Sequence, residues 1–236
     1  MKILADWIVK NEELFLRPCL ENVLPYIDKG VLVDTGSRDK TMEIALDVQK
    51  KFPHLEIKTC DIGPNYDLSK ARNVGLHSIP QNDWIDDDIF YFSISGDEVY
   101  DESIKNLREA LAKVPKEVVW VRCFGRGKEK DKDGNDFINP AILARPQIYR
   151  FCPGMIWRGY WNHDFLFHPT LGHYMAGHEE CPEHPWPANP PQRKPFIWPH
   201  SGIWYDNYHT QNGNRELRYK VYQEFEEMKK KGIPLA

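Results

Sequence analysis

Two acidic residues follow predicted strands at the places where parallel sheets bind their ligands. Asp34 ends a buried apolar stretch at 30–34, and Asp97 follows another at 89–94. In an open sheet with helices on both faces, ligands bind beyond the carboxyl ends of the strands. The two carboxylates therefore indicate a binding site. Each could instead serve locally, Asp34 by starting the turn through Thr35-Gly36-Ser37 and Asp97 by lying ahead of a helix.

The elements that must position these acids alternate along the first half of the chain. Strands are predicted at 3–9, 30–34, 55–59, 89–94 and 118–123. Helical spacing is found at 11–24 (interrupted by Pro18), 39–51 and 68–76, and from Asp101 onward. Such alternation implies an α/β fold of Rossmann-like type, with a mainly parallel sheet flanked by helices. Later in the chain we expect a charged hairpin tip at 128–136, a strand at 144–151 and an amphipathic helix at 215–231.

Composition excludes several classes of protein. The 236 residues carry 31 Lys and Arg against 35 Asp and Glu, a net charge of −4, which argues against a protein built around a polyanion. No run approaches the ~20 apolar residues of a membrane span, and the first residues do not form a signal peptide. The five cysteines are odd in number and scattered. Free thiols in a reducing compartment are the simplest interpretation, so we expect a cytoplasmic protein.

Four short motifs follow one another in a fixed order within the first 112 residues. They are Ile8-Val9-Lys10-Asn11-Glu12-Glu13, Val33-Asp34-Thr35-Gly36-Ser37 with Asp39 and Thr41, Ala71-Arg72-Asn73-Val74-Gly75-Leu76, and Ser95-Gly96-Asp97-Glu98. In this order and spacing the sequence resembles family 2 glycosyltransferases. Later stretches are similar to motifs of one branch: Gln147-Ile148-Tyr149-Arg150, Trp157-Arg158-Gly159, Asn162-His163-Asp164 and His200-Ser201-Gly202.

The resemblance implies a GT-A fold, an α/β domain that binds a nucleotide-sugar. Residues 1–236 would form one such domain. Residues 1–125 would bind the nucleotide-sugar, and 126–236, an irregular region rich in aromatic residues and proline, would form the acceptor side.

Donor-binding roles also follow from the resemblance. Asp34 would accept hydrogen bonds from the base, and Glu12 would lie near the ribose. Arg72 would place its planar guanidinium on the diphosphate or on an acid pair. Glu12 could instead be an acid in a first helical turn, and Arg72 could form a surface salt bridge. The other donor-binding positions are Val9, Asn11, Gly36, Asp67, Ser95 and Gly96.

Glycosyl transfer from a nucleoside diphosphate requires the charge of the leaving group to be neutralised, usually by Mn²⁺ or Mg²⁺. By resemblance, Asp97 is the second acid of the DxD motif and contacts the ion. Ser95 stands where the first acid would be, a departure that weakens the metal or ribose contact. His200 would be the remaining metal ligand, because imidazole suits such ions.

Transfer also needs a base to take the proton of the acceptor hydroxyl. Asp164 holds that position by resemblance, directly after His163, where the family usually has Glu. The two residues could otherwise be polar residues ending a strand. On the acceptor side, Trp157, Trp161, Trp198 and Trp204 could form an apolar platform for a sugar or an aromatic acceptor, or they could belong to the core. Asp164 and Arg72 are thus the catalytic candidates.

A rival metal site involves His173, His178, Cys181 and His184. Imidazoles and a thiolate suit structural zinc. The spacing matches no zinc finger, however, and a Pro- and His-rich acceptor loop is the alternative.

The expected reaction is inverting, metal-assisted transfer of a sugar from a nucleoside-diphosphate donor, with UDP-sugar favoured. The acceptor would be a hydroxyl of a glycan or, less readily, of a protein or a modified nucleic acid. A homo-oligomer is compatible with the sequence. The main alternative is a non-catalytic nucleotide-sugar or glycan-binding module that lost the first acid at Ser95. A nucleotidyltransferase is disfavoured because no Gly-rich, Lys-bearing loop follows the first strand.

Overall fold

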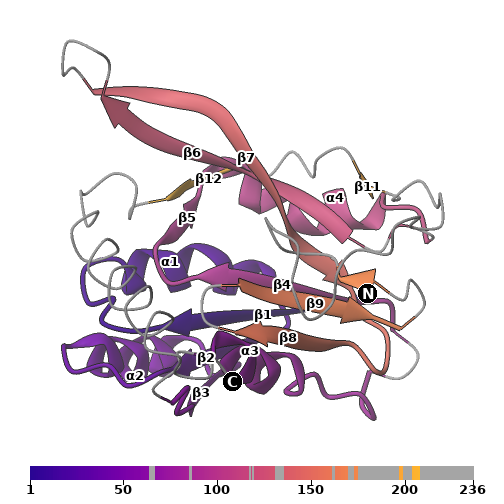
Figure 1. Cartoon of the computed structure of the whole chain (residues 1–236), viewed down its shortest axis with the longest axis horizontal. Helices are drawn as coiled ribbons and strands as arrows, with labels where there is room; N and C mark the ends of the chain where they lie inside the picture. The colour runs from indigo at the N-terminus through magenta and orange to yellow at the C-terminus, as the bar shows by residue number, and fades with distance from the viewer. Residues whose placement is uncertain are drawn as a thin grey trace, which may run out of the picture.

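A computed structural model of the chain contains two sheets and the helices that flank the larger one (Figure 1). It describes residues 1–63, 67–84, 87–116, 118, 120–130, 136–160, 163–169, 173–174, 197–198 and 204–207. No helix in these ranges is long and apolar enough to cross a membrane.

The larger sheet begins with four parallel strands in the order β3-β2-β1-β4. These are β1 (Lys2–Val9), β2 (Lys29–Asp34), β3 (Leu55–Thr59) and β4 (Ile89–Ser95). Beyond β4 the order continues β7-β6-β12-β5, and β11 also pairs with β6. These strands are β5 (Glu98–Tyr100), β6 (Trp120–Lys130), β7 (Asp136–Arg150), β11 (Ile197–Trp198) and β12 (Trp204–Asn207). The predicted fold class, an α/β structure with a mainly parallel sheet flanked by helices, is confirmed.

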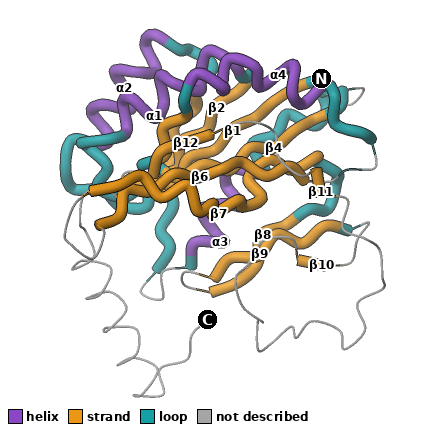
Figure 2. Tube along the Cα trace, turned by 90° about the horizontal axis from the view of Figure 1, so that it is seen from above, coloured by secondary structure: helices purple, strands orange, loops and turns teal. Residues whose placement is uncertain are grey.

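Helices and a small second sheet cover the two faces of the larger sheet (Figure 2). The helical elements are α1 (Leu16–Val23), η1 (Leu24–Tyr26), α2 (Thr41–Lys51), α3 (Leu68–Leu76), η2 (Glu102–Asn106) and α4 (Leu107–Ala112). The small antiparallel sheet consists of β8 (Ile156–Tyr160), β9 (His163–His168) and β10 (His173–Tyr174). Helices α1, α2 and α4 lie on one face, and α3 with β8 and β9 lies on the other.

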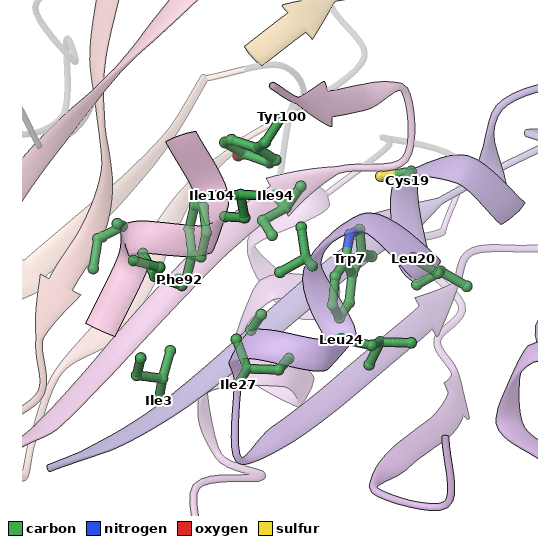
Figure 3. Close-up of a cluster of buried hydrophobic side chains, with 14 of the residues drawn as sticks. Ile3, Trp7, Cys19, Leu20, Leu24, Ile27, Phe92, Ile94, Tyr100 and Ile104 are labelled. Atoms are coloured by element: carbon green, nitrogen blue, oxygen red, sulfur yellow. The ribbon is translucent and has the colours of Figure 1, made fainter. Parts of the chain in front are cut away.

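Alternation along β1 explains why the two faces have separate cores. Trp7 and its neighbours two residues apart pack against α1 and α2, in a cluster that extends to Phe92 and Ile104 (Figure 3). Leu4, one residue out of phase, packs instead with Tyr91 and Trp157 on the face covered by α3. Because successive side chains of a strand point to opposite faces, one fully buried strand serves both cores.

The structure changes several predicted boundaries. The helix predicted at 11–24 starts only at Leu16. Asn11 itself has a left-handed backbone conformation, with φ of 58°, and so is not helical. Pro18 does not interrupt this helix, since it lies in the first turn, where no backbone donor is required. Asp101 caps the next helical element as expected, accepting from the Ser103 N–H, but that element is the 3₁₀ helix η2.

The hairpin predicted around 128–136 is real but much longer than expected. β6 and β7 pair from Trp120↔Tyr149 out to Lys130↔Asp136, so the two strands form an arm that extends from the sheet (Figure 1). The proposed division near residue 125 therefore falls inside β6. The helix expected at 215–231 lies outside the described residues.

Candidate active site

Three buried carboxylates lie at the carboxyl ends of three neighbouring strands. Asp34 ends β2, Glu12 follows β1, and Asp97 follows β4; their exposed fractions are 4%, 8% and 2%. Strand register brings their surroundings together, because Val9 pairs with Asp34 and Ile8 pairs with Ser95. The rule that ligands bind at this edge of a parallel sheet thus identifies one site, built from segments far apart in sequence.

Asp34 forms the turn that its sequence context predicts. Its carboxylate accepts from the N–H of Gly36 at 3.1 Å and from the N–H of Ser37 at 3.1 and 3.2 Å. Gly36 has a φ of 100°, a conformation that glycine adopts without strain. Because a carboxylate has about four acceptor sites, these bonds orient Asp34 while leaving acceptor capacity for a ligand. The turn and the predicted base contact are therefore compatible.

The loops after β1 and β2 are joined by a set of hydrogen bonds. The Asn11 N–H donates to the Ser37 hydroxyl, and the Asn11 side-chain oxygen accepts from the Arg38 N–H. Farther along, the Glu12 N–H donates to the Thr41 hydroxyl at 2.7 Å. The sequence motifs contained these residues, but only the fold reveals that Ser37 and Thr41 hold the loop carrying Asn11 and Glu12.

Asp39 completes this connection and provides a test of it. Its carboxylate accepts from the N–H groups of Thr41 and Glu13. Burial alone would raise the pKa of Asp39, but these bonds and that from the Thr41 hydroxyl outweigh it and lower the pKa. A carboxyl with a lowered pKa in the folded state stabilises the protein above its ordinary pKa of about 4, and this stabilisation is lost as the pH falls through the folded value.

We expect Asp39→Asn to reduce the free energy of unfolding at about pH 6, and the deficit to shrink below about pH 4. Urea unfolding of both proteins across this range measures the difference. A deficit that stays constant with pH would contradict the account.

Gly96 allows the loop after β4 to approach β1 closely. A Cβ at this position would lie 2.8 Å from Val9 Cγ1 and 3.0 Å from Glu12 Cγ. Beneath the loop, the buried Cys19 thiol donates to the Ser95 carbonyl at 3.4 Å. Burial, followed by the charge of Asp97 and a smaller effect of Glu12, raises the pKa of Cys19 well above its ordinary value. The thiol therefore stays protonated.

A buried acid, Glu98, fixes the turn that presents Asp97. Its Oε2 accepts from Gln147 Nε2 at 2.7 Å and from the Ser95 N–H at 3.2 Å, with the Tyr100 hydroxyl at 3.4 Å. These donors come from β7, from the end of β4 and from β5. Glu98 thus links β7 and β5 to the Ser95–Asp97 turn at the end of β4.

Replacing Glu98 by alanine is expected to lower the free energy of unfolding by about 2 kcal/mol, because it leaves buried donors without an acceptor. Glu98→Gln keeps one acceptor oxygen at this position and should cost less. Chemical denaturation ranks the two variants. Equal stability of Glu98→Ala and the unmodified chain would refute the bracing role.

The donor atoms at this edge fit a cation that is shared with substrate phosphates. Mg²⁺ and similar hard ions are usually held by one or two carboxylates together with phosphate oxygens. Within the described ranges, no three His, Cys, Asp or Glu side chains gather as a metal cluster. Glu12 nevertheless lies beside the loop that carries Asp97, because a Cβ on Gly96 would lie 3.0 Å from Glu12 Cγ. This set suits Asp97 as the principal protein ligand.

Helix α3 brings Arg72 to the same region. Its Nη1 donates to the hydroxyl of Ser93, two residues before Ser95 on β4, and its guanidinium lies over the Trp157 ring, 5.0 Å from the centroid. Asp67 caps this helix by accepting from the Ser69 N–H at 3.1 Å. The local role of Asp67 is therefore structural, whereas Arg72 is braced by contacts outside its own helix.

Trp157 is a core residue rather than an open platform. It is 4% exposed and packs with Tyr91, Tyr149 and Leu166. Of the two interpretations of its sequence, burial in the core is the one that the structure supports. The Trp157 ring is buried, and the Arg72 guanidinium lies over its face.

The remaining acceptor-side candidates are described only in part. His163 and Asp164 lie in β9, opposite Tyr160 and Gly159 of β8. Trp204 lies in β12 opposite Phe124. Trp161 and His200 lie outside the described residues, as do His178, Cys181 and His184 of the rival zinc set.

Comparisons with known proteins give one short curated match. The TPR repeat-containing protein Synpcc7942_0270 of Synechococcus elongatus is 35% identical over 78 residues, 33% of this chain and 17% of that protein. The chain thus matches about a sixth of the length of this relative.

Similar solved structures include TarS, a glucosyl-3-phosphoglycerate synthase and a mannosyltransferase. TarS 1–349 of S. aureus has 16% identity and a TM-score of 0.43, covering 64% of this chain and 47% of that one. Glucosyl-3-phosphoglycerate synthase of Mycobacterium tuberculosis, in complex with Mn²⁺, UDP and phosphoglyceric acid, has 18% identity and a TM-score of 0.39, covering 53% and 44%. The mannosyltransferase PcManGT of Pyrobaculum calidifontis, in complex with GDP-Man and Mn²⁺, has 15% identity and a TM-score of 0.41, covering 52% and 35%.

A family model covers far more of the sequence than the curated match does. The model of glycosyl transferase family 2 matches residues 8–168, more than half of the chain. This range includes the last two residues of β1, the three buried carboxylates, Arg72 and the small sheet as far as β9. The chain belongs to glycosyl transferase family 2.

Proposed function

We propose that the chain transfers a sugar from a nucleoside-diphosphate donor, with UDP-sugars favoured, to an acceptor hydroxyl. The observation that carries the proposal is the convergence of Glu12, Asp34 and Asp97 at the carboxyl ends of β1, β2 and β4. The guanidinium of Arg72 is braced at Ser93, near the end of the same strand β4. This combines acceptors for a base and ribose with a cation for a diphosphate.

The donor would lie across this edge in a fixed direction. Asp34 would accept from an N–H of the base, and Glu12 from ribose hydroxyls. Val9, Asn11 and Gly36 would line the nucleotide, with Ser95 and Gly96 beneath the phosphates. Arg72 would donate to diphosphate oxygens through its planar fork. The contact between Arg72 and the diphosphate would be stronger in the protein, where the effective dielectric constant is lower, than in water.

The reaction would proceed with inversion at the anomeric carbon. Asp164 would take the proton of the acceptor hydroxyl as its oxygen forms the new bond to that carbon. The bond from the anomeric carbon to the phosphate oxygen would break, and its electron pair would leave with the nucleoside diphosphate. Arg72 would stabilise the charge that develops there. When bound at Asp97, with His200 as a further ligand, Mn²⁺ or Mg²⁺ would supply additional neutralisation of the diphosphate.

The acceptor side would be formed by residues 126–236, which share the larger sheet with residues 1–125 through β6 and β7. His163, Trp161 and Trp204 are the proposed acceptor contacts in this part. A glycan hydroxyl is the favoured acceptor.

A panel of donors tests the proposed activity directly. The full chain is incubated with Mn²⁺ and UDP-glucose, UDP-galactose, UDP-N-acetylglucosamine or GDP-mannose, with and without a mixture of oligosaccharide acceptors. Release of UDP or GDP above the level with heat-inactivated protein is the expected result. Tight binding of the free nucleotide, with no release from any donor, would favour a non-catalytic nucleotide-sugar-binding module. This second function is considered because Ser95 stands in place of the first acid of the DxD motif.

A further inference from the structure

Among the described residues, Arg72 contacts two side chains outside its own helix. The first is the Ser93 hydroxyl on β4, which accepts from Nη1. The second is the Trp157 ring on β8, 5.0 Å from the guanidinium carbon to the ring centroid. Ser93 and Ser95 are two residues apart on one strand and therefore point to the same face. The guanidinium therefore lies on the same face of β4 as the side chain of Ser95, which is two residues before Asp97.

Trp157 is itself held at both its ring and its backbone. Its indole N–H donates to the Tyr91 hydroxyl at 3.2 Å, and that hydroxyl donates to Asp6 Oδ2 at 2.7 Å. At the backbone, the side-chain amide of Asn73 accepts from the Trp157 N–H and donates to the Trp157 carbonyl, each at 2.8 Å. Asn73 is the neighbour of Arg72 in α3, so one short helix segment both binds β8 and carries the arginine.

The direction of the bonds from Trp157 to Asp6 is fixed by chemistry. Burial, and next the charge of Asp6, raise the pKa of Tyr91 well above its ordinary value, although Arg72 acts in the opposite sense. The phenol therefore remains protonated. Since the indole N–H cannot accept, it donates to the phenol oxygen, and the phenol donates to the Asp6 carboxylate.

The ring of Trp157 is further restricted by aromatic neighbours. Tyr149 meets it edge-on, with centroids 5.9 Å apart and planes at 87°, and Tyr91 meets it at 6.5 Å and 64°. With one edge bonded and these contacts around it, the ring has little freedom to tilt. A cation over an aromatic face is attracted to it, and the attraction is stronger when water is excluded.

We propose that Trp157 is a positioning residue, whose fixed ring holds the Arg72 guanidinium in place to bind the diphosphate of the donor. This inference rests on the proposed function, because it assigns Arg72 to a nucleoside diphosphate. Trp157 has no contact with the substrate in this account and acts through Arg72. The Asp6–Tyr91 pair and Asn73 act one step farther away, by fixing Trp157.

The test compares ligands with and without phosphates. Binding of UDP and uridine to the full chain, or of GDP and guanosine if the chain binds guanine nucleotides, is measured by calorimetry with Mn²⁺. We expect Trp157→Leu to weaken UDP binding about tenfold and to leave uridine binding within about twofold. Phe92→Leu, a core change on the opposite face of the sheet, should leave both affinities unchanged. Equal losses for UDP and uridine would overturn the positioning role.

A double substitution separates positioning from packing. In an Arg72→Met background, Trp157→Leu should cause no further loss of UDP affinity, although its effect on thermal stability should persist. Additive losses of affinity would overturn the proposal. If Trp157→Leu does not fold, Trp157→Phe and Tyr91→Phe replace it, and each should cause a smaller, UDP-selective loss; no loss in either would also overturn it. If the unmodified chain binds neither UDP nor GDP, the proposed function itself fails.

Discussion

Asp97→Ala is expected to lower kcat for sugar transfer by about a thousandfold, the largest effect of any single substitution in this site. Asp97 follows β4, is 2% exposed, and would be the principal protein ligand of the cation that neutralises the leaving diphosphate. Its removal takes away charge stabilisation that is needed most as the anomeric bond breaks, so kcat should fall more than donor affinity. Initial rates of UDP or GDP release, measured over a range of donor concentrations, give both quantities.

Two further variants show whether the charge of Asp97, at that position, accounts for the loss of activity. Asp97→Asn keeps the size of the side chain but removes its charge, and should be nearly as inactive. Glu102→Ala removes one acidic charge from an exposed position on η2, where the side chain pairs only with Lys105 among the described contacts, and should retain full activity. Undiminished turnover in Asp97→Ala would refute its assigned role.

Arg72→Met should lower kcat for transfer by about a hundredfold, because the diphosphate loses a charged, bidentate partner. Arg72→Lys keeps the charge but not the planar fork, so its activity should fall between the two. The order Arg, Lys, Met is therefore a prediction about geometry as well as charge. Steady-state rates with one donor rank the three proteins.

Lys70→Met supplies the matched control for Arg72→Met. Lys70 lies on the same helix, two residues earlier, and is exposed, with a distant contact of 4.0 Å to Asp67. The substitution removes the same charge from the same element and should leave kcat within about twofold, since an exposed ion pair contributes little. Equal losses in Arg72→Met and Lys70→Met would show that overall charge, and not the position of Arg72, accounts for the effect.

The parallel part of the fold was predictable because its elements carry strong local signals. The strand at 55–59 and the helix at 68–76 begin and end as expected. Continuous apolar runs identify strands that are buried on both faces. The arm of β6 and β7 was underestimated because the charged residues near 128–136 do not show the apolar alternation of a half-buried strand.

The sequence was sufficient to predict which acids lie at the ends of strands. Asp34 and Asp97 follow from the rule for strand ends, and the structure brings Glu12 to the same edge. The supports of the site could not be predicted in this way. Trp157 and Tyr91 are 66 residues apart in sequence, and Gln147 and Glu98 are 49 apart. Such pairs depend on which strands become neighbours, which residue spacing alone does not specify.

A structure of the full chain with Mn²⁺ and UDP would show directly where the nucleotide binds. We expect the uracil to lie within hydrogen-bonding distance of Asp34 and the diphosphate to contact Arg72. The ion should be bound by Asp97, with His200 as a further ligand. UDP bound away from the carboxyl ends of β1, β2 and β4, or an ion bound without Asp97, would contradict this proposal.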